Sequence, residues 1–482
     1  MKFFSKNKKG SALAFVLVIM TVVAIILASI LQFVASEVKS SIYKVNKEKA
    51  FQVAEAGIND YLWYINKKIG SLTDPQAIEN FWNGNPRGVG VKYQATFPAN
   101  DPIGTYEIEV TPPDITTSTI TVTSTGWANN NSSVKRTIKI KLKKNAWSDF
   151  TLVSNSIFTA GAGAVYDGKV HSNVGMYFDA IGKSEVSSSV ACFNTNSAHP
   201  TTGTNYYGVS NSADSHPSYP CPSSPPDNFF PSMPAVFQAG RFIESPVSFT
   251  SIGNSLSYMK AKASDGTHGY YFDNTLCSGS NLGRHIILQG NKMTVTTVKT
   301  LKTTSPFTAA HKIIGTEGCT TIINNFINNS VIFVENDIWL EGNVDGRRVT
   351  VVAAKEPLGD NTGGVNVYLS KDITYNHTDG SDMIGIIGQN NVWVNQDCES
   401  DLIIDASIVA KNGRTGLNDN FSGSKTKLTI YGARVTNVAS YFQSGSDGFS
   451  TRNYTYDTNL INQSPPFFPT KAGYKIDNWE EF

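Results

Sequence analysis

Near its N-terminus the chain contains a long apolar segment without a single charge. This segment spans residues 11–34 and reads SALAFVLVIMTVVAIILASILQFV. A bilayer core about 30 Å thick requires about 20 apolar helical residues, so the segment is long enough to cross a membrane. Lys2, Lys6, Lys8 and Lys9 precede it and predict a cytoplasmic N-terminus. We therefore expect a single-pass protein of the inner, or cytoplasmic, membrane whose remaining chain lies outside the cytoplasm.

The helical pattern continues well past this apolar segment. Between Ser11 and Gly57 there is no Pro or Gly. We expect one helix over residues 11–68, transmembrane over about 11–34, with a length of roughly 85 Å. A cleaved secretory signal has an apolar part of only about 7–15 residues and fits less well. Beyond the membrane, apolar residues recur at the three- and four-residue spacing of an amphipathic helix: Val38, Ile42, Val45, Phe51, Ala54, Ile58, Leu62 and Ile65.

A short basic leader that ends in Gly10 and is followed by such a helix resembles the class III signal of type IV pilins. The resemblance implies that a prepilin peptidase cuts between Gly10 and Ser11 and removes residues 1–10. Ser11 would then be the mature N-terminus and would be N-methylated. The resemblance also implies that the retained helix binds other pilins in a filament or secretion assembly.

Two further features narrow this resemblance. The stretch AFQVAEAGINDYL resembles the helix of PilX-like minor pilins; its motif is Ala54, Glu55, Ala56 and Gly57. The fifth residue of the mature chain would be Phe15, where major pilins carry a glutamate that neutralises a neighbour's N-terminal amine. Phe15 has no charge to do so, which favours a low-copy, initiating or tip subunit. The alternative is a plain membrane anchor with a coincidental Lys-Gly junction.

The remainder of the chain is predicted to be mostly β-structure. Only 16% of the residues are charged, and the chain is rich in turn-forming residues. Within residues 69–145, the runs 105–111, 119–126 and 135–144 alternate with a period of two. They predict a small antiparallel, pilin-like module on which the second half of the helix packs. The fold class is therefore α+β and mostly β.

Three further segments follow this module. Residues 146–300 are predicted to be β-rich, with a Ser- and Pro-rich surface loop at about 194–234. Residues 301–464 contain short strands between Asn, Asp and Gly turns, which favours a parallel β-helix, with a β-sandwich as the alternative. Residues 465–482 are interpreted as a C-terminal tail that two prolines cap.

The five cysteines fit an exported protein, but spacing does not fix their pairing. The pairs nearest in sequence are Cys192 with Cys221 and Cys277 with Cys319, which would leave Cys398 over. Free buried thiols are the alternative.

Chemistry-bearing motifs are scarce. The sequence has no P-loop, GxGxxG, HExxH or GxSxG motif, and we predict no catalytic residues, no enzymatic activity and no cofactor. Calcium is a weak candidate because two turns cluster oxygen ligands, and turn formation explains them as well. The calcium candidates are Asp379, Asp382, Asp397 and Asp401.

Charge gives no indication of nucleic-acid binding. The formal net charge is +1, and outside the first ten residues 36 basic residues stand against 39 acidic ones, a net charge of −3. The resulting hypothesis is a minor pilin or pseudopilin that initiates assembly or displays a tip head for adhesion to a surface glycan or protein. The alternative is a membrane-anchored β-helix enzyme or binding protein for surface polysaccharide.

Overall fold

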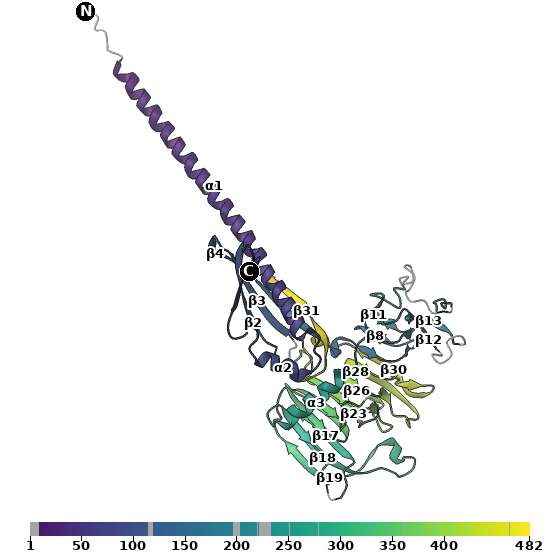
Figure 1. Ribbon diagram of the computed structural model, residues 1–482. Helices are drawn as coiled ribbons and strands as arrows, with labels where there is room; N and C mark the ends of the chain where they lie inside the picture. Colours follow the sequence, from purple (N-terminus) through teal and green to yellow (C-terminus); the bar gives the residue numbers. More distant parts are fainter. Residues whose placement is uncertain are drawn as a thin grey trace, which may run out of the picture.

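The computed structural model of the protein describes residues 9–113, 119–195, 203–218, 220, 233–249, 251–277, 279–360, 362–461 and 463–482. Its longest element is helix α1 (Lys9–Ile65), which continues as a π-helical turn, η1 (Asn66–Gly70). Figure 1 shows α1 projecting from the folded part of the molecule, with the N-terminus at its far end. Its first half is exposed, whereas one face of its second half is buried from Ala50 onward. The predicted long helix is therefore confirmed.

The second half of α1 packs on one antiparallel sheet. The strands lie in the order β1 (Tyr93–Phe97), β2 (Gly104–Thr111), β3 (Thr119–Ala128), β4 (Asn131–Ala146) and β31 (Thr470–Glu481). Helix α2 (Pro75–Asn83) begins at Asp74, whose side chain caps it by accepting a hydrogen bond from the Gln76 backbone N–H. We call α2, this sheet and the second half of α1 the stalk module.

The last strand corrects the interpretation of residues 465–482 as a tail. β31 pairs antiparallel with β4, Ile476 lying opposite Leu142, and Tyr474 is buried in the core of the stalk module. The physical reason is the long β4, whose outer edge would otherwise expose unpaired backbone groups. The two prolines end the preceding segment, as expected, but the chain then re-enters a ladder.

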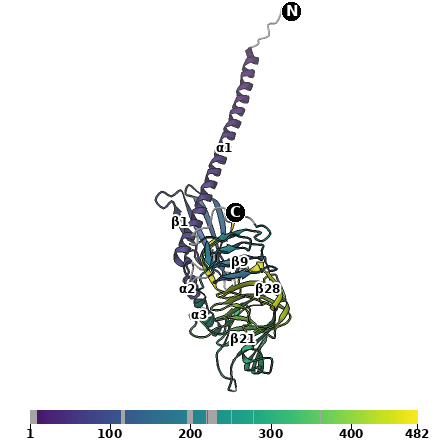
Figure 2. The ribbon, with the colours of Figure 1, turned by 90° about the vertical axis from the view of Figure 1, so that its right-hand side faces the viewer.

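The rest of the chain, residues 147–469, is inserted between β4 and β31, and we call it the head. It leaves and re-enters the stalk module at one place, where the backbone N–H of Trp147 donates to the carbonyl of Pro469 at 3.3 Å. Lys262 on helix α3 (Ser251–Ser264) also pairs with Glu79 on α2 at 2.7 Å. Figures 1 and 2 show the head at the end of the stalk module opposite to the free half of α1.

A continuous parallel ladder runs through the head. Its order differs from the order in the sequence, because β28 returns to lie beside β5. The chain therefore begins in the middle of the ladder, builds one end, and then returns from the other end. The ladder contains β16 (Gly269–Phe272), β20 (Ser330–Val334), β22 (Arg348–Ala353), β24 (Met383–Gly388), β26 (Asp401–Ala410), β28 (Ser424–Thr436), β5 (Leu152–Ser154), β8 (Val170–Ser172), β11 (Val186–Ser188) and β15 (Arg241–Ile243).

A second parallel ladder accompanies the first, and a short third one flanks it. The second contains β17 (Gly283–Gly290), β21 (Asp337–Val344), β23 (Val367–Tyr375), parts of β26 and β28, β30 (Asp447–Thr455), β7 (Val165–Tyr166) and β10 (Ile181–Gly182). The third contains β23, β25 (Val392–Val394) and β27 (Thr415–Leu417).

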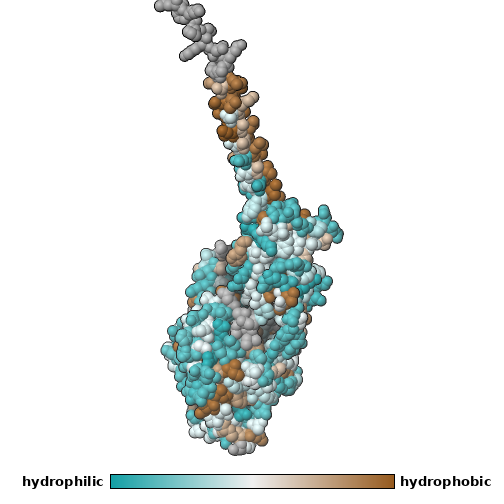
Figure 3. Space-filling model, turned by 90° about the vertical axis from the view of Figure 1, so that its left-hand side faces the viewer, coloured by the Kyte–Doolittle hydropathy of each residue, from teal (hydrophilic) through white to brown (hydrophobic). Residues whose placement is uncertain are grey.

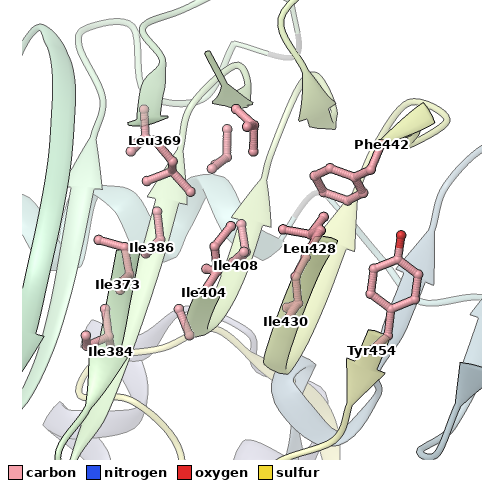
Figure 4. Close-up of a cluster of buried hydrophobic side chains, with 14 of the residues drawn as sticks. Leu369, Ile373, Ile384, Ile386, Ile404, Ile408, Leu428, Ile430, Phe442 and Tyr454 are labelled. Carbon is pink, nitrogen blue, oxygen red and sulfur yellow. The ribbon is translucent and has the colours of Figure 1, made fainter. Parts of the chain in front are cut away.

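Between these ladders lies the main core of the head. Ile, Leu and Val side chains of successive strands stack in rows, and Phe442 and Tyr454 continue the row at one end (Figure 4). The predicted class, α+β with a small antiparallel sheet and a large β-rich domain, is confirmed. The closed parallel β-helix stays a prediction. The regions 146–300 and 301–464, which we expected to differ, share one sheet of 21 strands.

Residues 146–300 contain a helix that the β-rich interpretation of this region missed. Helix α3 lies outside the ladder and buries Ile252, Leu256 and Met259 against side chains of the first ladder. The predicted loop at 194–234 falls partly outside the described residues. Its described part contains β13 (Asn205–Tyr207), which forms a hairpin with β12 (Cys192–Asn194), and β14 (Val209–Ser210), so it is not all loop.

The end of the head farthest from α1 in Figure 1 is an antiparallel extension, in which β17 pairs with β18 (Lys292–Leu301) and β18 with β19 (Ile314–Ile323). We call these three strands the distal hairpin. The other elements are η2 (Trp147–Asp149), β6 (Phe158–Ala160), β9 (Met176–Phe178), η3 (Ala309–His311), β29 (Gln443–Ser444) and η4 (Thr458–Ile461).

Candidate functional site

The first half of α1 is the largest apolar surface in the described part of the chain. Every large apolar side chain from Leu13 to Val45 is exposed, and the helix is long and apolar enough to cross a membrane. Figure 3 shows these apolar residues along the projecting helix, above a head whose visible face is mostly polar. Gly10 and Ser11, between which cleavage is predicted, lie in the first turn of α1. Phe15, the predicted fifth residue of the mature chain, is 70% exposed.

The Ala54–Gly57 motif packs the helix closely on the sheet. Ala54 and Gly57 are buried, whereas Glu55 is exposed and Ala56 is half-buried. A Cβ atom on Gly57 would come closer than 3.0 Å to the Ser124 and Tyr106 side chains. Gly126 on β3 faces the helix in the same way, because its Cβ would overlap the Ala50 carbonyl oxygen and the Ala54 backbone nitrogen. Small residues on both sides therefore allow the helix and sheet backbones to approach.

Polar groups also connect the helical part of the stalk module to the rest of that module. Asp60 on α1 accepts a hydrogen bond from the Tyr106 hydroxyl at 3.0 Å and lies 3.6 Å from Arg87. Lys144 donates to the carbonyl of Leu72 at 2.7 Å, and burial lowers the pKa of this ammonium group to about 8. The sequence singled out neither group.

Of the predicted cysteine pairs, one is described in full. Cys277, before β17, is bonded to Cys319 on β19 with Cα atoms 6.0 Å apart, so the disulfide fastens the distal hairpin. Cys192 is also disulfide-bonded, and its predicted partner Cys221 lies outside the described residues. Cys398 is a buried free thiol.

The calcium candidates lie in or beside turns, and three of the four accept hydrogen bonds from protein groups. Asp382 is buried and accepts from the backbone N–H groups of Arg347, Asn376 and His377. Asp379 accepts from Ser381 at 2.9 Å. Asp397 accepts from the Ser370 hydroxyl at 2.8 Å, and Asp401 begins β26. Among the described residues there is no group of three or more His, Cys, Asp or Glu side chains arranged to hold a metal ion.

Two groups of polar side chains connect neighbouring strands of the head. Asparagine side chains hydrogen-bond to one another beside neighbouring strands. For example, the Asn391 amide before β25 donates to the Asn366 amide oxygen before β23 at 2.9 Å. Carboxylates gather near the second ladder, where burial first, and then Asp372 and Asp457, raise the pKa of Asp405 to about 6. These carboxylates already accept protein hydrogen bonds, for example Asp405 from the Tyr375 backbone N–H at 3.1 Å.

One histidine joins three strands at the distal hairpin. His285 on β17 lies 2.8 Å from Glu317 on β19 through Nδ1 and 3.6 Å from Glu341 on β21 through Nε2. Burial alone would lower the pKa of His285, but hydrogen bonds to Glu341 and Glu317 outweigh it and raise the pKa. The residues come from strands 24 or more positions apart, so sequence proximity gave no signal of this cluster.

We expect the distal hairpin to lose stability as pH rises through the pKa of His285. A raised folded-state pKa stabilises the protein fully below the unfolded value near 6.5, and this contribution disappears above the folded value. The effect is about 1 kcal/mol. Hydrogen-exchange protection of β18 and β19, corrected for intrinsic rates at pH 5.5 and 8.0, measures it. A His285→Gln variant with the same pH dependence as the parent would contradict this assignment.

The comparisons with known proteins agree with the sequence analysis at the N-terminus. Residues 9–59 match the family described as PilX N-terminal. The crystal structure of the competence-associated pilin ComZ from Thermus thermophilus aligns with 91% of this chain and 97% of its own, at 12% identity and a TM-score of 0.33. No curated protein matches the chain. The predicted resemblance of the N-terminal segment to PilX-like pilins is confirmed.

Proposed function

We propose that the chain is a minor pilin of a type IV pilus-like system, anchored in the membrane before assembly and displaying its head outside the cytoplasm. The observation that carries this proposal is the contrast along α1. Residues 12–45 expose apolar side chains that only lipid or other helices can cover, whereas from Ala50 onward one face of the helix is buried against its own module. The PilX N-terminal match covers both halves.

The proposed position is at an initiating or tip site and not along the shaft. Phe15 offers no carboxylate to a neighbour's N-terminal amine. The head is also bulky. It contains residues 147–469, which are inserted between β4 and β31, two strands that pair directly with each other. A subunit at the end of a filament accommodates such a head without steric conflict with its neighbours. There the head is available for adhesion, to a surface glycan or a protein ligand.

Processing is the first test of the proposal. We expect the mature chain to begin at Ser11 and to carry one added methyl group, because a prepilin peptidase would cut after Gly10. Intact-mass measurement of the membrane-extracted protein detects both changes. A Gly10→Glu variant is expected to keep its leader completely, and Gly359→Glu, the same substitution at an exposed glycine whose Cβ would meet no atom within 4 Å, serves as the processing control. A mature chain that begins at Met1 or after Val34 would overturn the proposal.

Assembly is the second test. Deletion of the protein is expected to reduce or abolish filaments if it initiates assembly, and to leave filaments but abolish attachment if its head is a tip adhesin. Electron microscopy and an attachment assay on the same cells separate these roles. Normal filaments with normal attachment would contradict both.

The alternative function, a membrane-anchored enzyme for surface polysaccharide, depends on the Asp372, Asp405 and Asp457 carboxylates. The pKa of Asp405, about 6, would suit a general acid. We nevertheless favour a non-enzymatic head. Asp457 is buried, and its Oδ1 accepts from the Tyr431 hydroxyl on β28; Oδ1 of Asp372 on β23 accepts from the Ile403 backbone N–H on β26. These two oxygens therefore hold neighbouring strands together. Polysaccharide cleavage that Asp405→Asn abolishes would reverse this preference.

A further inference from the structure

Where the two ends of the head sequence meet in the ladder, an arginine is buried, and none of the described residues supplies a counter-ion for it. Arg434 lies on β28, opposite Leu152 of β5, and is 2% exposed. Its Nε and Nη2 atoms are enclosed and have no hydrogen-bond partner. A guanidinium group remains charged in proteins, and enclosing an unpaired charge is costly. This position therefore requires an explanation.

Aromatic rings surround the guanidinium group. Its central carbon lies 4.0 Å from the centre of the Tyr454 ring and 5.4 Å from that of Phe442. Such contacts offset part of the cost of burial. The Tyr166 and Tyr454 hydroxyl groups also interact with Arg434 by hydrogen bonding, but burial raises the pKa of both phenols, so they are neutral and do not balance the charge. Figure 4 shows Phe442 and Tyr454 at the end of the apolar row.

Arg434 lines a cavity of about 350 Å³ at this meeting point. The lining comes from residues 157–166 at the start of the head and residues 434–454 near its end. Its charged side chains are Arg434 and Arg452, and no Asp or Glu is among the described residues that line it. Gln443 at the rim is exposed, so the cavity opens to solvent.

We propose that this cavity binds an acidic sugar, with the carboxylate of a hexuronate ring accepting hydrogen bonds from Arg434. Charge-assisted bonds between guanidinium and carboxylate groups are among the strongest in proteins, and an anion here would supply the missing counter-charge. The volume fits one sugar ring, at the small end of the range for ligand sites, about 300–1,000 Å³.

The lining favours a sugar acid over a free inorganic anion. Phe158, Tyr166 and Tyr454 provide apolar ring surfaces, which suit the C–H face of a sugar and offer nothing to a small hydrated ion. Ser440 and Thr159 add hydroxyl groups that can pair with those of a sugar. This inference goes beyond the filament role and does not depend on it, because binding is measured on the isolated chain.

Calorimetric titration of the full chain in detergent micelles tests the proposal with glucuronate as the probe. We expect saturable binding of glucuronate and none of glucose, which has the same ring without the carboxylate. Arg434→Met, which keeps the length of the side chain but removes the charge, is expected to weaken binding about tenfold or more. Arg87→Met is the matched control, because Arg87 also stacks on an aromatic ring, Tyr64 at 4.7 Å, but lies beside Asp60 in the stalk module, away from the cavity.

A second measurement avoids any folding defect of the variant. Glucuronate is expected to increase hydrogen-exchange protection of β28 and β30 in the unmodified protein and to leave the distal hairpin unchanged. Absence of glucuronate binding, equal binding by Arg434→Met, or preferential binding of inorganic phosphate would each overturn the proposal. Preferential binding of N-acetylglutamate amide would also overturn it and would point to an acidic peptide.

Discussion

Replacing Gly126 by valine is expected to separate the second half of α1 from the sheet of the stalk module. A Cβ atom at this position would overlap the Ala50 carbonyl oxygen and the Ala54 nitrogen, which are backbone atoms and cannot rotate away. The helix must therefore shift as a whole. Overpacked cores usually lose about 1–3 kcal/mol, and rigid neighbours place this substitution at about 3 kcal/mol or more.

Hydrogen exchange on the full chain in detergent micelles measures the loss of stability in each part of the molecule. A single unfolding midpoint would not separate the stalk module from the head. Protection is expected to fall in residues 50–65 and in β3, while the ladders of the head remain protected. Thr123→Val is the matched control: it introduces the same side chain on the same strand, but on the face turned away from the helix. Unchanged protection in Gly126→Val would show that the close contact contributes little to stability.

The close contact also shows what the sequence could predict of the helix. Period and charge predict a helix over 11–68 because a continuous helical pattern is a local property, and the structure has α1 at Lys9–Ile65. The strands at 105–111, 119–126 and 135–144 are found as β2, β3 and β4 with small shifts, because each alternates and lies next to its partner in sequence. The Ala54–Gly57 motif was noticed as a resemblance, and its partner Gly126 was not, because nothing in the sequence relates the two.

The features that were missed depend on partners distant in sequence. Arg434 lies in the strand KLTIYGARV, where Leu428 and Ile430 share its parity, so alternation alone places it on the buried face. Alternation does not show which residues surround Arg434. Its surroundings depend on residues 157–166, which lie beside residues 434–454 in the fold. Helix α3 was missed because its sequence, SIGNSLSYMKAKAS, has few strongly apolar residues and sits among turn-forming segments.

β31 was also missed, because its partner strand β4 lies more than 300 residues earlier in the sequence. Removal of β31 is expected to destabilise the stalk module strongly. A stop codon after Pro469 removes residues 470–482, takes Tyr474 out of the core of the stalk module and leaves β4 as an unpaired edge. We expect β4 and the second half of α1 to lose protection from exchange and the protein to aggregate. The head is expected to keep its protection, because its ladders end before Pro469.

Point substitutions on the same strand separate lost packing from lost backbone pairing. Tyr474→Ala removes a ring that is 6% exposed and is expected to cost about 3–5 kcal/mol, as for other buried aromatic residues. Trp479→Ala removes a ring that is 41% exposed and is expected to cost about 1 kcal/mol or less. Equal effects of the two would mean that β31 stabilises the stalk module through its backbone alone. A truncated chain with full protection of β4 would mean that the head closes the module without β31.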